Sequence, residues 1–130
     1  MRDYKKYDVW KLSHQMTLEV YRITESFPKA ETFGLSSQLR RAASSIGLNI
    51  AEGCGRGSDE DFKRMLVIAN GSAFETEYAL LLCKDLKFLS LNEFENISPL
   101  IEELKMKISK LILKLQADTE ARKKSGVGLK

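Results

Sequence analysis

A regular pattern of small and apolar residues in the middle of the chain restricts the fold more than any other feature. Its members follow one another at alternating steps of four and three: Phe62, Leu66, Ala69, Ala73, Thr76, Leu80 and Cys83. This spacing puts them on one face of a helix and has the period of left-handed bundle packing. Ser58 and Asp61 resemble a capping box, which predicts that the helix begins there. At 1.5 Å per residue, a helix of about thirty residues reaches about 45 Å.

Three further segments carry the same kind of pattern. The first consists of Val9, Leu12, Met16, Val20, Ile23 and Phe27, and Pro28 ends it. The second consists of Leu35, Leu39, Ala42, Ile46, Asn49 and Gly53, and glycines at 53, 55 and 57 end it. The last consists of Ile97, Ile101, Leu104, Ile108, Leu111 and Leu115, after a second capping box at Ser90 and Glu93. Pro99 leaves two readings open: it kinks this helix, or Ser98 caps its main part with Pro99 at the first helical position.

No segment shows the alternation of period two that is typical of a hairpin. The predicted fold is therefore all-α, an antiparallel up-down four-helix bundle. With 130 residues the chain fits one domain. We expect this single bundle domain to occupy residues 1–120 and a flexible basic tail to occupy residues 121–130.

Composition and cysteine usage indicate the surroundings of the chain. The N-terminus has no signal-peptide pattern, and Cys54 and Cys83 lack the spacing of metal ligands, so we expect a reduced, cytoplasmic protein. The longest apolar run, 78–83, is far shorter than the roughly 20 residues that span a bilayer, so we expect no membrane contact.

The sequence offers little for catalysis. His14 is the only histidine, and no carboxylate or thiol is placed beside it by sequence. The glycine-rich stretch 53–58 lacks the lysine of a phosphate-binding loop, and acidic residues follow it directly, so we interpret it as a turn. We expect no enzyme activity, no catalytic residues, no metal site and no cofactor.

Two features bear on self-assembly. Ala43, Gly47 and Ala51 line a flank of the second helix, which fits either a close crossing inside the bundle or a subunit contact. The end of the third helix is apolar on several sides, more than one core face uses. The residues concerned are Leu80, Leu81, Leu82, Leu86, Phe88 and Leu89. A homo-oligomer is therefore favoured over a monomer.

Asn49 sits at a core-stripe position, where a polar group is costly unless it is paired. Charged residues on its own and neighbouring helices could supply partners. The predicted structural network consists of Arg40, Arg41, Asn49, Glu52, Glu75 and Glu77.

Three stretches carry a resemblance to a known family. They are VW at 9–10, FPKAETFGLSSQLRRAASSIGLNIAEGCGR at 27–56 and GSAFETE at 71–77. The chain resembles the S23, or 23S rRNA intervening-sequence, protein family over roughly residues 5–115, with Gly47 and Leu48 standing where relatives often have Pro-Ser. The resemblance implies an antiparallel four-helix bundle, assembly as a homopentamer, and a binding or scaffold role. A similar protein, the accessory variability determinant of diversity-generating retroelements, partners a reverse transcriptase and contacts nucleic acid.

Nucleic-acid binding requires cations that neutralise phosphates. The candidates are Lys5, Lys6, Lys11, Arg56, Lys63, Arg64, Lys107, Lys110 and Lys114, with Arg40 and Arg41 shared with the network. The leading hypothesis is an oligomer that binds RNA or DNA through this basic surface, alongside a protein partner. The alternative is a structural or protein-interaction scaffold, such as a reverse-transcriptase accessory, in which Lys107, Lys110 and Lys114 are only a solvated helix face.

Overall fold

The chain folds as four long α-helices, two of them preceded by short 3-10 helices. This computed structural model describes residues 2–126. The elements are η1 (Tyr4–Lys6), α1 (Asp8–Thr24), η2 (Lys29–Glu31), α2 (Leu35–Gly55), α3 (Asp59–Asp85) and α4 (Leu91–Ser125). No strand occurs among the described residues, so the predicted all-α fold of four helices is confirmed.

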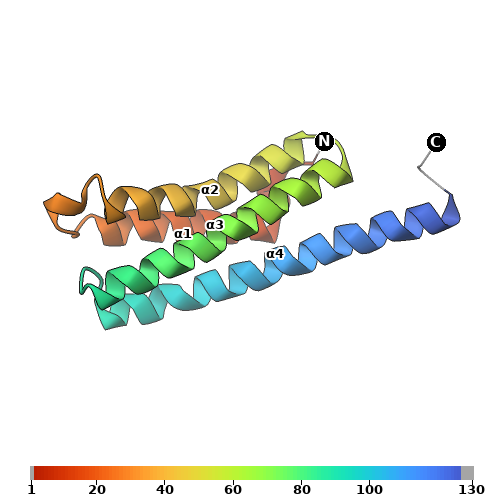
Figure 1. Cartoon of the computed structure of the whole chain (residues 1–130). Coiled ribbons are helices and arrows are strands. Elements are labelled where there is room, and N and C mark those ends of the chain that lie inside the picture. The colour runs from red at the N-terminus through yellow and green to blue at the C-terminus, as the bar shows by residue number, and fades with distance from the viewer. Residues whose placement is uncertain (1, 127–130) are drawn as a thin grey trace.

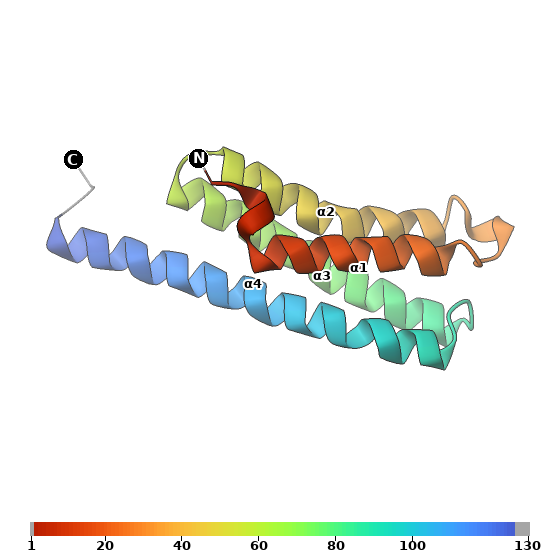
Figure 2. The same ribbon diagram turned by 180° about the vertical axis from the view of Figure 1, so that it is seen from behind.

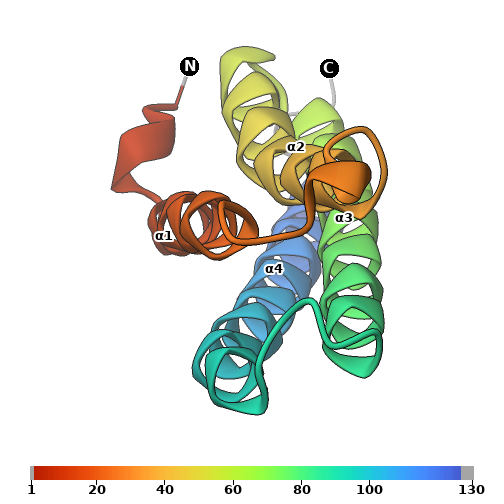
Figure 3. The same ribbon diagram turned by 90° about the vertical axis from the view of Figure 1, so that its left-hand side faces the viewer.

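The helices run up and down in sequence order and form a four-cornered bundle (Figures 1 and 2). α1 contacts α2 and α4, and α3 contacts the same two helices from the opposite corner. Figure 3 shows this cross-section from the end at which α1 and α3 finish. The C-terminal part of α4 extends past the turn between α2 and α3.

Serine caps begin the two longest helices as the sequence predicts. Ser58 Oγ accepts a hydrogen bond from the Asp61 N–H at 3.1 Å, and Ser90 Oγ accepts one from the Glu93 N–H at 3.1 Å. Between α2 and α3 the backbone turns through Gly57, which has a φ of 87°. A residue with a Cβ is strained in that conformation, so glycine is needed there.

The bundle core consists of the predicted stripes, with one change of register. All seven members of the α3 stripe are buried. On α2, Asn49 is only half-buried and the fully buried residue is Ile50. Steps of three and four from Ile46 both stay on one face, and α2 turns Ile50 toward the core because it packs between α1 and α3.

Two features of α4 could not be read from its sequence pattern. Pro99 lies inside α4, which begins at Leu91, so Ser98 is not the cap of its main part. A proline at this point removes one helical hydrogen bond without ending the helix. The helix also continues to Ser125, into the segment that we assigned to the flexible tail, and residues 127–130 lie outside the described part of the chain.

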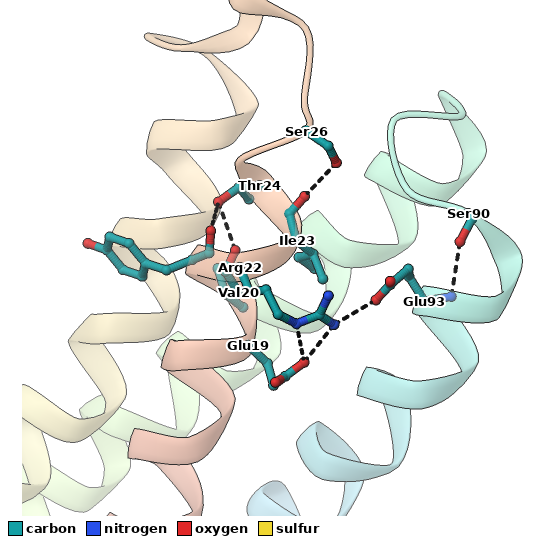
Figure 4. A network of polar contacts seen from close by, with 9 residues as sticks. Glu19, Val20, Arg22, Ile23, Thr24, Ser26, Ser90 and Glu93 are labelled. Carbon is teal, nitrogen blue, oxygen red and sulfur yellow. Dashed lines mark hydrogen bonds and ion pairs between the residues drawn. The ribbon is translucent and has the colours of Figure 1, made fainter.

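An arginine joins the end of α1 to the start of α4 (Figure 4). Arg22 Nη2 donates to Glu19 Oε2 at 2.8 Å and to Glu93 Oε2 at 2.9 Å. The Glu93 N–H also donates to the Ser90 cap, so these contacts link the first turn of α4 to the last turn of α1 at this end of the bundle.

Candidate nucleic-acid interface

Many of the predicted phosphate-binding cations lie beside a carboxylate three or four residues earlier in the chain. The pairs are Arg56 with Glu52, Lys63 with Glu60 at 3.0 Å, Arg64 with Asp61 at 3.4 Å, and Lys107 with Glu103 at 3.1 Å. Each pair is close to neutral as a whole, so it attracts a phosphate less strongly than a free cation does.

The remaining lysine candidates are exposed and lie at the end of the bundle where α1 begins. Lys6, Lys11, Lys110 and Lys114 have no carboxylate within ion-pair distance among residues 2–126, and Lys5 Nζ lies 5.7 Å from the centre of the Tyr4 ring. Lys107 and Lys110 line a groove of about 300 Å³ together with Tyr7 and Asp8. The fold thus places α4 lysines next to the segment that follows Lys5 and Lys6.

The six residues of the predicted polar network do not come together. Asn49 Nδ2 donates to Ser45 O of the same helix at 2.7 Å. Glu52 pairs with Arg56, and Glu77 accepts from Lys105 of α4 at 2.7 Å. Glu75 is exposed and has no ion pair within the described part of the chain. Because these residues point to different sides of α2 and α3, separate local contacts replace the expected network.

The other two members of that network, Arg40 and Arg41, line a groove between the end of α1 and the start of α2. Its volume is about 590 Å³. Its lining residues are Tyr21, Thr24, Glu25, Phe27, Lys29, Thr32, Phe33, Ser36, Ser37, Arg40, Arg41 and Ser44. Arg40 Nε donates to Thr24 Oγ1 at 2.7 Å, and its guanidinium carbon lies 4.5 Å from the centre of the Tyr21 ring. The sequence reasoning missed Lys29 and Phe33, which precede α2 and carry no periodic signal.

A carboxylate bridges three parts of the chain at the opposite end of the bundle. Arg122 of α4 and Arg2 of the N-terminal segment both donate to the carboxylate of Asp59, the first residue of α3. These hydrogen bonds, that of Arg122 first, lower the pKa of Asp59. The bridge keeps both arginines engaged inside the molecule.

The small-residue flank of α2 serves the crossing with α1. A Cβ atom on Gly47 would lie 3.2 Å from Ser13 Oγ, and Thr17 Oγ1 donates to Ala43 O at 3.2 Å. Of the two readings left open by the sequence, these contacts are those of a close crossing inside the bundle.

An apolar stripe runs along the outer side of α3. Val67, Phe74, Tyr78 and Leu81 follow one another at helical spacing and are 54%, 54%, 63% and 39% exposed, respectively. Of the predicted excess of apolar residues near the end of α3, only Leu81 belongs to this stripe: Leu80 and Leu89 are buried, and Leu86 is exposed just past the end of the helix.

The residues considered for chemistry lie apart. His14 is exposed and stacks on Trp10 with ring centres 4.9 Å apart. Cys54 and Cys83 are buried, and desolvation raises the pKa of both thiols. Within residues 2–126 no group of three histidine, cysteine or acidic side chains is placed to hold a metal ion, and no helix is long and apolar enough to cross a membrane.

Comparison with known proteins relates this bundle to one family. The family model described as 23S rRNA-intervening sequence protein matches residues 5–110. A crystal structure of a protein of unknown function from the S23 ribosomal protein family of Bacteroides thetaiotaomicron VPI-5482 is similar, with 28% identity and a TM-score of 0.72. The alignment covers 80% of this chain and 97% of that chain. No curated protein matches the chain.

Proposed function

The chain belongs to the 23S rRNA-intervening sequence protein family, and we propose that it is a non-enzymatic protein that binds RNA or DNA through its basic surface. The observation that carries this proposal is the lysine row of α4, which we define as Lys107, Lys110 and Lys114. Two of its members, Lys110 and Lys114, are exposed without a carboxylate partner among the described residues.

The geometry of the lysine row suits a phosphate backbone. Its members follow at steps of three and four residues, so they lie about 5 Å apart along the helix axis. A duplex carries about one negative charge per 1.7 Å of its axis, so each lysine ammonium group can meet a phosphate wherever along the duplex the protein binds. Lys6 of η1 and Lys11 in the first turns of α1 extend the positive surface.

A salt titration of binding tests the proposal. Fluorescence anisotropy with a structured RNA is expected to give an affinity that falls steeply with salt. The triple variant K107E/K110E/K114E is expected to make the fall of log K with log salt less steep by about 2 to 3, at roughly 0.9 for each lost phosphate contact. The comparison variant K63E/R64E changes cations already paired with Glu60 and Asp61, so its slope is expected to change less. Absence of binding at low salt would reject the proposal.

We also propose that the protein is a homo-oligomer in which a second copy covers the apolar stripe of α3. The resemblance of the sequence to proteins that form homopentamers supports five copies. Burial of the stripe supplies the driving force, since each square ångström of apolar surface removed from water contributes about 25 cal/mol. We place this assembly in the cytoplasm, where two free cysteines stay reduced.

One observation favours the alternative function, a structural or protein-interaction scaffold that accompanies a partner such as a reverse transcriptase. Arg56, Lys63, Arg64 and Lys107 are each paired with a carboxylate three or four residues earlier in the chain, as is common on solvated surfaces. The salt titration separates the two functions, because a scaffold without a nucleic-acid role shows no binding at low salt.

A further inference from the structure

The groove between the end of α1 and the start of α2, which we call the arginine groove, has unmatched positive charge. Lys29, Arg40 and Arg41 contribute cations to its lining, and Glu25 contributes the only carboxylate. The surplus of cations makes the groove suitable for an anion.

Arg40 and Arg41 differ from every other arginine in the described residues. Arg2 and Arg122 pair with Asp59, Arg22 pairs with Glu19 and Glu93, and the remaining two pair with Glu52 and Asp61. Arg40 and Arg41 have no carboxylate within ion-pair distance in residues 2–126. Their guanidinium groups, adjacent in sequence and lining one groove, are therefore available to an anion from outside the bundle.

Arg40 is held in a defined position by uncharged groups, which do not neutralise its positive charge. Its Nε donates to Thr24 Oγ1, and its Nη2 donates to Tyr21 O at 3.3 Å. Thr24 is in turn fixed by donating to Val20 O at 2.7 Å, and Figure 4 shows this contact. A guanidinium held in this way loses little entropy when it binds a ligand.

Hydroxyl groups surround the two arginines. Thr32, Ser36 and Ser37 line the groove, and none of their hydroxyls has a hydrogen-bond partner within the described chain. Hydroxyls and arginines together are the side chains that most often contact phosphate oxygens.

An aromatic ring stands at the edge of the same groove. Phe33 is 97% exposed, an unusual position for a phenyl group. Such a ring offers a flat face on which a base can stack, and stacking needs no particular base. Phosphate-binding cations and a free aromatic ring thus lie on one groove.

We propose that the arginine groove binds an unpaired nucleotide of an RNA or DNA strand. Arg40, Arg41 and Lys29 contact the phosphate, and Phe33 stacks on the base. This assignment rests on the proposed nucleic-acid function and adds to it a preference for single-stranded segments. A duplex keeps its bases stacked on each other, so it meets the lysine row but leaves Phe33 uncovered.

Binding of two labelled RNAs of equal length to the full-length protein tests the assignment. One RNA is an unstructured oligouridine, and the other is a perfect duplex. Arg41→Gln and Phe33→Ala change exposed side chains, so both variants are expected to keep the wild-type circular dichroism and melting temperature. Each is expected to weaken binding of oligouridine by about fivefold or more, the size of one lost stacking contact for Phe33→Ala and of one lost hydrogen bond to a charged group for Arg41→Gln. Phe33→Tyr keeps the ring and is expected to retain binding. Binding of the duplex is expected to stay within about twofold, a change of about 0.4 kcal/mol.

The outcomes separate this proposal from the function on which it rests. If wild-type protein binds neither RNA, both are rejected. If it binds both RNAs and Arg41→Gln and Phe33→Ala bind oligouridine as wild type does, only the groove assignment is rejected. If these variants instead dissociate the oligomer in light scattering, the occupant of the groove is an acidic surface of a second copy, and the nucleotide assignment is again rejected.

Discussion

Gly53 of α2 lies directly against Met65 of α3, so close that a Cβ atom on Gly53 would be 2.9 Å from Met65 Cβ. The Phe62 ring is equally close to that position. We expect Gly53→Ala to lower the free energy of unfolding by about 1–3 kcal/mol, because a methyl group forces α2 and α3 apart. Urea unfolding followed by circular dichroism measures this change.

Gly55, two residues further along α2, provides the control. A Cβ there meets nothing within 4 Å, so Gly55→Ala is expected to change the free energy by less than about 0.5 kcal/mol. Equal effects of the two substitutions would mean that the contact with Met65 adds no cost.

Asp59 makes folding sensitive to acid. Because hydrogen bonds, first from Arg122, lower its pKa in the folded chain, its contribution is full above its unfolded pKa of about 3.9 and is lost as the pH falls through the folded pKa. We expect Asp59→Asn to reduce stability by about 1 kcal/mol at pH 7, with the two proteins converging as the pH falls below the lowered folded pKa of Asp59. Glu60→Gln, in the same helical turn, is the control and is expected to cost less. Parallel curves of stability against pH for Asp59→Asn and wild type would contradict this role.

Cys83 is expected to be unreactive in the folded protein. Burial raises the pKa of its thiol to about 11, and the thiolate is the reactive form. At pH 8 a thiol reagent should label Cys83 only as fast as the bundle opens, and in urea it should label at once. Because the folded pKa is raised, the contribution of the thiol to stability is full below about pH 8.5, the unfolded pKa, and is lost as the pH rises toward 11. Cys83→Ser keeps only Cys54 and is the control. If the native variant and native wild type are both labelled rapidly at Cys54 alone, Cys83 is protected as predicted. Rapid labelling of Cys83 itself would contradict the prediction.

The α3 stripe offers a test of assembly. The variant F74E/Y78E places two charges on the stripe and is expected to reduce the mass from light scattering to that of a monomer, 14.8 kDa, because burying an unpaired charge is costly. Leu113→Glu changes a residue of α4 that is also exposed and is expected to leave the mass unchanged. A wild-type protein that is already monomeric at micromolar concentration would refute the proposed oligomer.

Local sequence patterns predicted the helices and several of their ends. The α3 stripe and the Ser58 and Ser90 caps are confirmed because helical periodicity and capping depend on residues three or four positions apart. The local pattern did not predict correctly which of Asn49 and Ile50 faces the core. Steps of three and four from Ile46 are equally helical, and contact of α2 with both α1 and α3 selects Ile50 for the core.

The sequence by itself thus determined an all-α chain of four amphipathic helices with serine caps and glycine at the turn before α3. Only the tertiary structure decided which charges are neutralised between helices. Glu77 meets Lys105, and Asp59 meets Arg122, because the rotation and depth of packed helices bring together residues 28 and 63 positions apart. The same packing leaves Arg40 and Arg41 without a carboxylate and places Phe33 beside them. Ion pairing depends on distances of a few ångströms, and such distances between helices are set by core packing, which no local spacing encodes.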